Sequence, residues 1–297
     1  MKKLGKLFGS VLPFFAAVGI QYTLAIFFAF MYGILVSVIA GIKFGLSGVS
    51  DKDKIAQVIE GSLSMEILYV FSMIASLACG IVFFFWYRHL IRFEVRGSLK
   101  KLFTVKNLVL LILLGLGCQS FLTGFMSLIQ PFFYDLFDDY ADVVEQLMSG
   151  NIVTVVVYTI FMAPIVEELI FRGVILHKAN KVIPFLGANI LQAILFGIYH
   201  MNIVQGIYAT IAGFLFGLMY YKFRNIYAPI MLHMIINASS FVIIYLPTGI
   251  LPFVVAMLIG FALIVITIAL LKMKENSIAQ TYPGAVSGLD QVENLVN

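Results

Sequence analysis

Charge is what this sequence has least of. Only 11% of its 297 residues are Asp, Glu, Lys or Arg, whereas 62% are hydrophobic. A soluble globular domain has about a quarter charged residues and roughly half apolar ones. This composition excludes an ordinary soluble domain and predicts an all-α polytopic membrane protein. A single polytopic domain accounts for the length.

Cysteine is also scarce, and features of nucleic-acid binding are missing. Cys79 and Cys118 lie in separate apolar runs, so we expect no disulfide, and the chain has no Cys-x-x-Cys metal motif. The basic residues lie in short segments between apolar runs, without a basic tail or a Gly-rich phosphate loop. The net charge of +4 therefore does not indicate a nucleic-acid partner. The expected surroundings are a lipid bilayer.

Long apolar runs dominate the chain, and eight of them are long enough, or nearly so, to cross a bilayer. They lie at residues 12–38, 66–87, 107–130, 151–173, 184–200, 203–222, 226–246 and 249–271. The first run exceeds the apolar part of a signal peptide and lacks a clear cleavage site, so it is expected to be a transmembrane helix. We predict a bundle of eight transmembrane helices over residues 1–274, followed by a polar cytoplasmic tail over 275–297.

The distribution of Lys and Arg supports this topology. With eight spans, 16 of the 19 Lys and Arg residues fall on the side of the two termini, and only Lys43, Lys52 and Lys54 fall on the other. The loop 131–150 on that other side has no Lys or Arg and carries several carboxylates. Because Lys and Arg accumulate in cytoplasmic loops, both termini are predicted to be cytoplasmic.

Asp, Glu, Lys and Arg side chains well inside the predicted spans are confined to the fourth run. They are Glu167, Glu168 and Arg172. Each costs several kcal/mol in hydrocarbon, so such residues commonly mark functional sites. Glu168 and Arg172 are four residues apart and share a helix face, which predicts an ion pair. Neighbouring side chains on an α-helix point about 100° apart, so Glu167 is expected to face a different direction, towards the site.

Two later runs contribute histidines with partners at helical spacing. Phe196 precedes His200 by four residues on the fifth run, and Asn237 follows His233 by four residues on the seventh. Each pair lies on one helix face.

The spacing of the fourth and fifth runs places their polar groups at one level. Glu168 and His200 are each 16 residues from Pro184 in the intervening turn, which is ~24 Å at ~1.5 Å per residue. His233 lies only ~12 Å from the near end of its own helix by the same rise. It reaches this level only if the hairpin of the fourth and fifth runs projects beyond the membrane.

These residues can hydrolyse a peptide bond. Glu167 is suited to act as a general base on a water held between it and His200. His233 and the amide of Asn237 can donate hydrogen bonds to the developing oxyanion. We therefore take these four as candidate catalytic residues, with Glu168 and Arg172 as supporting residues, within a catalytic core at residues 150–240.

Other interpretations of the polar residues stay open. Polar side chains often hold transmembrane helices together, as in a non-enzymic immunity or regulatory membrane protein. The same network could line the path of an ion or substrate in a transporter. The Gly213-x-x-x-Gly217 pair indicates close helix packing within the bundle rather than a dimer interface.

Taken in order, the three polar motifs resemble those of the CPBP family, the CaaX-protease and bacteriocin-processing membrane endopeptidases that are also called Abi proteins. The resemblance covers residues ~150–240 and includes every polar position expected of the family. The motifs are Glu167-Glu168-x-x-x-Arg172, Phe196-x-x-x-His200 and His233-x-x-x-Asn237.

The resemblance implies an eight-helix intramembrane endopeptidase whose site opens to the cytoplasmic side. Glu167 and His200 would activate the water, and His233 and Asn237 would stabilise the oxyanion. The family is described both as metalloproteases and as metal-free, glutamate-dependent enzymes. Glu167, His200 and His233 would suffice as ligands for a divalent metal such as zinc with an open position, so the cofactor is left open between such a metal and none.

The expected partner is a peptide or protein substrate, with or without an attached lipid. The preference for Lys over Arg and the abundance of Ile, Phe and Tyr suggest an AT-rich bacterial genome, and hence a bacterial plasma membrane. This origin favours a leader or signal peptide over a prenylated CaaX carboxyl terminus as substrate.

Overall fold

The computed structural model describes residues 2–46, 56–57, 61, 65–94, 96–243 and 248–271. Regular structure in this part of the chain is entirely helical. The longer α-helices are α1 (Lys2–Leu46), α3 (Met65–Leu90), α5 (Val105–Ile129), α6 (Tyr134–Met148), α10 (Phe185–Tyr199), α11 (Ile203–Phe223), α12 (Tyr227–Ile243) and α13 (Ile250–Leu270). Shorter pieces are α4 (Leu99–Leu102), η1 (Gln130–Phe132), α7 (Ile152–Val156), η2 (Val157–Met162), α8 (Ala163–Glu168), η3 (Leu169–Leu176) and α9 (His177–Asn180).

The apolar runs of the sequence coincide with these helices. Six helical stretches are long and apolar enough to cross a membrane, namely Lys3–Phe44, Glu66–Leu90, Val105–Phe132, Ile152–Asn180, Ile203–Phe223 and Ile250–Leu270. The other two apolar runs form α10 and α12, which have 15 and 17 residues. At ~1.5 Å per residue they are shorter than a hydrocarbon core of about 30 Å. The all-helical membrane fold is confirmed, while the count of eight spans stays a prediction, and the tail at 275–297 lies outside the described residues.

One segment differs from its expected form. Within the segment 131–150, expected to be a loop, residues 134–148 form the acidic helix α6. Its apolar and acidic residues alternate with helical period, and Asp135 lies in its first turn, where a carboxylate is favourable. The hydroxyl of Tyr140 lies 3.1 Å from that of Tyr208 on α11, which ties the helix to the bundle.

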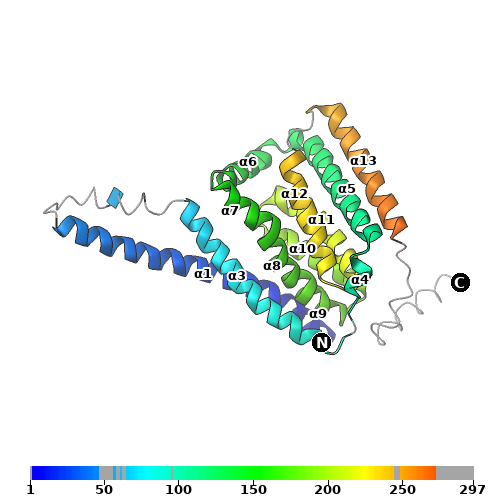
Figure 1. The fold of residues 1–297 in the computed structure, drawn as a ribbon, viewed down its shortest axis with the longest axis horizontal. Helices are drawn as coiled ribbons and strands as arrows, with labels where there is room; N and C mark the ends of the chain where they lie inside the picture. The colour runs from blue at the N-terminus through cyan, green and yellow to red at the C-terminus, as the bar shows by residue number, and fades with distance from the viewer. Residues whose placement is uncertain are drawn as a thin grey trace.

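The helix that carries the glutamate pair lies in the middle of the molecule. Figure 1 shows α1 and α3 at one edge and α5 and α13 side by side at the other. Between them, α8 and η3 contact α1, α3, α10, α11 and α12. Side chains on several faces of α8 and η3 therefore meet protein rather than lipid.

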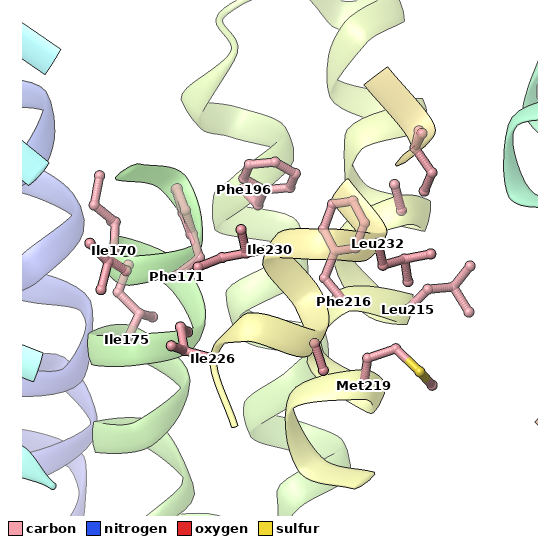
Figure 2. Close-up of a cluster of buried hydrophobic side chains, with 14 of the residues drawn as sticks. Ile170, Phe171, Ile175, Phe196, Leu215, Phe216, Met219, Ile226, Ile230 and Leu232 are labelled. Atoms are coloured by element: carbon pink, nitrogen blue, oxygen red, sulfur yellow. The ribbon is translucent and has the colours of Figure 1, made fainter. Parts of the chain in front are cut away.

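An apolar core encloses this central helix. Figure 2 shows Phe171 of η3, Phe196 of α10, Phe216 of α11 and Ile230 of α12 within one cluster. Phe171 and Phe196 pack edge to face with ring centroids 5.0 Å apart. Polar groups among these side chains lie in a low-dielectric environment, where a paired group is held strongly and an unpaired one is costly.

Glycines let α11 approach α10 closely. A Cβ at Gly217 would collide with the side chain of Asn189, and one at Gly213 would press on Phe196 and Arg172. The predicted packing role of Gly213-x-x-x-Gly217 within the bundle is confirmed.

Candidate active site

The helix that carries the glutamates is not a regular α-helix. The π-helical segments η2 and η3 flank α8, and π segments are rare and frequent at functional sites. In η2 the N–H of Ala163 donates to the carbonyl of Tyr158, five residues back. The same spacing pairs the carbonyl of Thr159 with residue 164, which is a proline and has no N–H. The helix therefore leaves the Thr159 carbonyl without its own donor.

Asn237 supplies the missing donor. Its Nδ2 donates to the carbonyl oxygen of Thr159 at 2.8 Å, joining α12 to η2. An amide nitrogen carries two N–H groups, so this contact occupies one and leaves the other for a further acceptor.

Glu168 and Arg172 form the ion pair that their spacing predicts. Arg172 Nη1 donates to Glu168 Oε1 at 2.8 Å, and both side chains are fully buried. The guanidinium also donates through Nη2 to the carbonyl of Gly213 at 2.9 Å. It lies 4.6 Å and 4.9 Å from the ring centroids of Phe196 and Phe216. These contacts offset the cost of burying a charge, which is several kcal/mol for an uncompensated ion.

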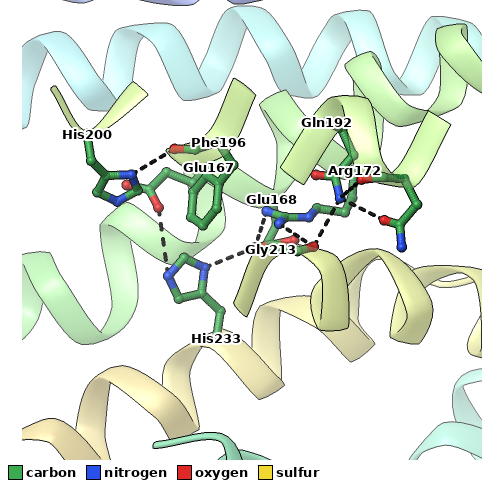
Figure 3. Close-up of polar contacts among 9 residues, drawn as sticks. Glu167, Glu168, Arg172, Gln192, Phe196, His200, Gly213 and His233 are labelled. Atoms are coloured by element: carbon green, nitrogen blue, oxygen red, sulfur yellow. Dashed lines mark hydrogen bonds and ion pairs between the residues drawn. The ribbon is translucent and has the colours of Figure 1, made fainter. Parts of the chain in front are cut away.

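His233 lies between the two glutamates, as Figure 3 shows. Its Nδ1 is 2.9 Å from Glu168 Oε1, and its Nε2 is 3.7 Å from Glu167 Oε2. The ring stacks on Phe216 with centroids 4.5 Å apart. Because the Glu168 carboxylate paired with Arg172 can only accept, Nδ1 of His233 carries a proton and Nε2 faces Glu167. The 3.7 Å separation between Nε2 and Glu167 Oε2 is longer than a direct hydrogen bond.

His200 is oriented by its own helix. Its Nδ1 lies 2.8 Å from the carbonyl oxygen of Phe196, and a carbonyl only accepts, so Nδ1 is the donor. In the neutral ring Nε2 is then a proton acceptor. The Phe196 ring contacts both imidazoles, with centroids 4.8 Å from His200 and 5.7 Å from His233. The Phe-x-x-x-His motif thus positions two histidines through one backbone carbonyl and one ring.

The two glutamates differ in accessibility. The side chain of Glu167 is 14% exposed, whereas that of Glu168 is fully buried. A reactant can therefore reach Glu167, while Glu168 is enclosed between Arg172 and His233.

The conditional metal ligands do not form a ligand cluster. Within the described ranges, no group of three or more His, Cys, Asp or Glu side chains is arranged to hold a metal ion. Nδ1 of His233 faces a carboxylate and Nδ1 of His200 faces a carbonyl, so only the Nε2 atoms of the two rings could bind a metal. Glu167, His200 and His233 are not arranged as a metal site within the described ranges, and no step below passes through a metal.

The sequence interpretation missed several contacts. It paired Glu168 with Arg172 alone, and it did not place Phe216 or the carbonyl of Gly213 in the site. It also assigned no role to Asn189 and Gln192 of the fifth run, although two amides in an apolar helix are themselves a sign of a buried polar network.

Comparisons with known proteins point to the same segment. Residues 149–239 match the family model described as type II CAAX prenyl endopeptidase Rce1-like. The chain is also 30% identical over 89 residues to the Bacillus subtilis (strain 168) protein named "Putative membrane peptidase YdiL", a stretch that covers 30% of this chain and 36% of that relative. The match thus spans about a third of the relative's length. No solved structure shows a significant match to the chain.

The matched segment contains all seven motif residues that the sequence singled out. It begins just before α7 and ends within α12, so it includes the ion pair, both histidines and Asn237. The similarity over residues 149–239 supports the resemblance of this membrane protein to the CPBP family of CaaX-type proteases.

Proposed function

We propose that this protein is an endopeptidase that hydrolyses a peptide bond at the membrane, with Glu167 as general base. The observation that carries the proposal is the contact of both His200 and His233 with the Phe196 ring, with Glu167, the accessible carboxylate of the pair, 3.7 Å from His233. The match to a family of endopeptidases over the same segment supports it.

The first step is activation of a water between Glu167 and Nε2 of His200. Both groups accept a proton in this arrangement, so the water loses a proton as its oxygen attacks the carbonyl carbon of the substrate. The carbonyl becomes a tetrahedral oxyanion. The proton taken from the water is then passed to the leaving amine as the carbon–nitrogen bond breaks.

The second requirement is a donor for the oxyanion. A protonated His233 that donates Nδ1–H to Glu168 would present Nε2–H on the side of Glu167. The second N–H of Asn237 is the other candidate donor. Each donor of this kind is worth about 10²–10³ in kcat in other hydrolases.

The substrate is proposed to be a leader or signal peptide, or a CaaX-type carboxyl terminus, cleaved on the cytoplasmic side. An apolar cavity of about 390 Å³ lies between α5, α10, α11 and α13, next to Ala193 and Thr210. Its lining would accept an isoprenoid or a lipid tail, so prenylated substrates belong in the test beside plain peptides.

The test is cleavage by the purified full chain in detergent or nanodiscs. Fluorogenic leader peptides and matched CaaX peptides, with and without a prenyl group, would be compared for the wild type, Glu167→Gln and His200→Ala. We expect cleavage by the wild type and loss of it in both variants. Cleavage that survives both substitutions would exclude the proposed site.

The two alternative functions, a transporter and a non-enzymic membrane protein, predict different results. Uptake of solute into proteoliposomes without any proteolysis would replace the enzyme by a transporter. A cellular phenotype that Glu167→Gln leaves intact would indicate a non-enzymic immunity or regulatory protein.

A further inference from the structure

A second polar cluster lies behind Arg172, away from the reacting groups. Gln192 of α10 is fully buried, and its Nε2 lies 3.0 Å from the carbonyl of Gly213, 2.7 Å from Asn189 Oδ1 and 3.0 Å from the Asn189 carbonyl. Asn189 Nδ2 in turn donates to the carbonyl of Phe214 at 3.1 Å. Figure 3 shows Gln192 beside the guanidinium of Arg172.

The orientation of the Gln192 amide follows from its neighbours. All three partners of its Nε2 are acceptors, because Asn189 uses its Nδ2 on another carbonyl and must present Oδ1. A flipped amide would direct Oε1 at three oxygens. Nitrogen therefore faces the Gly213 carbonyl, which also accepts from Arg172 Nη2 at 2.9 Å.

This carbonyl is the first member of a chain of contacts that ends in the site. Gln192 and Arg172 share the Gly213 oxygen, Arg172 holds Glu168 Oε1 at 2.8 Å, and Glu168 holds His233 Nδ1 at 2.9 Å. Every member from Gln192 to Glu168 is fully buried. A displaced Arg172 guanidinium therefore cannot turn to solvent, so its displacement is expected to shift Glu168 and the imidazole of His233.

Close helix packing leaves little slack at this point. A Cβ at Gly213 would lie 3.0 Å from Arg172 Nη2 and 2.9 Å from Phe196, and a Cβ at Gly217 would collide with Asn189. The backbone of α11 thus touches both the guanidinium and the amides of α10.

We propose that Gln192 is a positioning residue for proteolysis, which fixes the Arg172 guanidinium on the Gly213 carbonyl and, through Glu168, sets the orientation and tautomer of His233. The inference rests on the proposed function for its effect on rate, but not for its effect on the imidazole. It assigns Gln192 a role that packing of α10 on α11 alone does not require.

The first experiment measures kcat and KM for Gln192→Met, which keeps the volume of the side chain and removes its donors. We expect kcat to fall about ten-fold or more with KM within about two-fold, because a misplaced group costs rate rather than substrate affinity. Gln119→Met is the matched control, since Gln119 lies half-buried on α5 and bonds only Thr123 among the partners described. A role limited to packing would lower the yield of folded enzyme and leave kcat per folded molecule unchanged, which would overturn the proposal.

A double-mutant cycle tests the route of the effect. In a Glu168→Gln background the link between Arg172 and His233 is already weakened, so Gln192→Met should lower kcat by no more than about two-fold further. The same loss in both backgrounds would show that Gln192 does not act through Glu168, and would overturn the proposal.

The third experiment does not depend on proteolysis. The chain has four histidines, so ¹⁵N-histidine labelling of the full protein in nanodiscs, with assignment by a His233→Gln variant, reports the protonation of each His233 nitrogen. We expect the Nδ1 and Nε2 shifts of His233 to change in Gln192→Met and to stay fixed in Gln119→Met. If Gln192→Met does not fold, Gln192→Glu keeps the shape and directs a competing carboxylate at Arg172, and the same change is expected.

The outcomes are distinguishable. An unchanged His233 spectrum in every folded Gln192 variant overturns the inference, whatever the enzyme cleaves. A changed spectrum in a protein that cleaves none of the peptides supports the positioning role and counts against the proposed function alone.

Discussion

Glu167 and Glu168 are adjacent in the chain but have different surroundings. Glu168 accepts from both Arg172 and His233 and is fully buried, whereas Glu167 is 14% exposed and lies 3.7 Å from Nε2 of His233. The spacing of the residues predicted that the pair would separate into a reactive and a supporting carboxylate. The contact with His233 adds a role for Glu168, because this carboxylate also orients the His233 imidazole.

Isosteric amides at the two positions should separate these roles. Glu167→Gln removes the proposed base, so we expect cleavage to fall by about 10² or more. Glu168→Gln keeps a hydrogen-bonding group but loses the charge that holds Arg172 and His233, so we expect a loss of about ten-fold together with lower stability. Steady-state kinetics on both purified variants check this. If Glu168→Gln has the larger effect, Glu168 is the base and Glu167 the supporting residue, and the proposed rotation of α8 is wrong.

Arg172 should matter more for stability than for chemistry. Arg172→Met leaves the buried Glu168 without its cation, and breaking a buried pair in this way costs about 3–5 kcal/mol. We expect a large drop in the thermal unfolding midpoint in detergent.

A variant that lacks both charges is the control for Arg172. Arg172→Met with Glu168→Met removes the uncompensated carboxylate, and apolar replacements of a buried pair are often tolerated. The double variant should recover much of the stability without recovering activity. A double variant as unstable as Arg172→Met would show that the loss came from packing and not from the isolated charge.

Helix irregularity and glycine contacts decide the site at the scale of elements. The helix is π-helical in η2, before the glutamates, and Pro164 cannot donate to the Thr159 carbonyl. Asn237 on α12 donates to this carbonyl instead. Glycines bring α11 against α10 and α5 against α13. The first pair of helices carries the polar network, while the second lies away from it, so the two can be perturbed separately.

The seam of α5 and α13 should affect stability alone. A Cβ at Gly260 would collide with the backbone of Phe121 and Gly117, which would force the helices apart. We expect Gly260→Ala to lower stability by about 1–3 kcal/mol and to leave kcat of the folded enzyme on peptides without a lipid unchanged. Thermal unfolding and kinetics on one preparation would measure both.

Gly33→Ala on α1 is the matched control, since a Cβ there meets nothing within 4 Å. Alanine also favours helix over glycine by about 1 kcal/mol, so its stability should not fall. A comparable loss in both variants would contradict the packing argument.

The whole molecule carries opposite charge at its two ends. Basic residues gather near the ends of α3, α9 and α11, and the acidic helix α6 lies near the other end of the bundle. This polarity is consistent with the prediction that both termini are cytoplasmic and that α6 lies on the other side of the membrane.

Cysteine labelling tests the orientation. Asp142 on α6 and Lys181 after α9 are exposed, and the native Cys79 and Cys118 are buried. With a membrane-impermeant maleimide on intact cells, Asp142→Cys should react at once and Lys181→Cys only after permeabilisation. Labelling of both cysteines in intact cells would contradict a membrane crossing between residues 142 and 181. Labelling of Lys181→Cys alone would show that the protein has the opposite orientation in the membrane.

Composition and spacing determined much of this protein without any structure. The helical membrane fold follows from apolar runs that cannot be soluble and from backbone groups that must bond within a helix in lipid. The Glu168–Arg172 pair follows from spacing on one helix, because residues four apart meet whatever surrounds them. The grouping of motifs on successive runs also indicated the family.

Contacts between helices were decided by the tertiary structure. Three contacts depend on how far each helix is rotated and how closely it approaches its neighbour. They are the hydrogen bonds from His233 to Glu168, from Asn237 to the Thr159 carbonyl and from Arg172 to the Gly213 carbonyl. A pattern of i, i+4 residues gives the face of a helix but not its rotation against another, and π-helical segments change that rotation after Pro164. The absence of a Cβ at Gly213 also sets the distance between helices, because a Cβ there would press on Arg172. The Gly213 carbonyl can thus accept from the buried guanidinium.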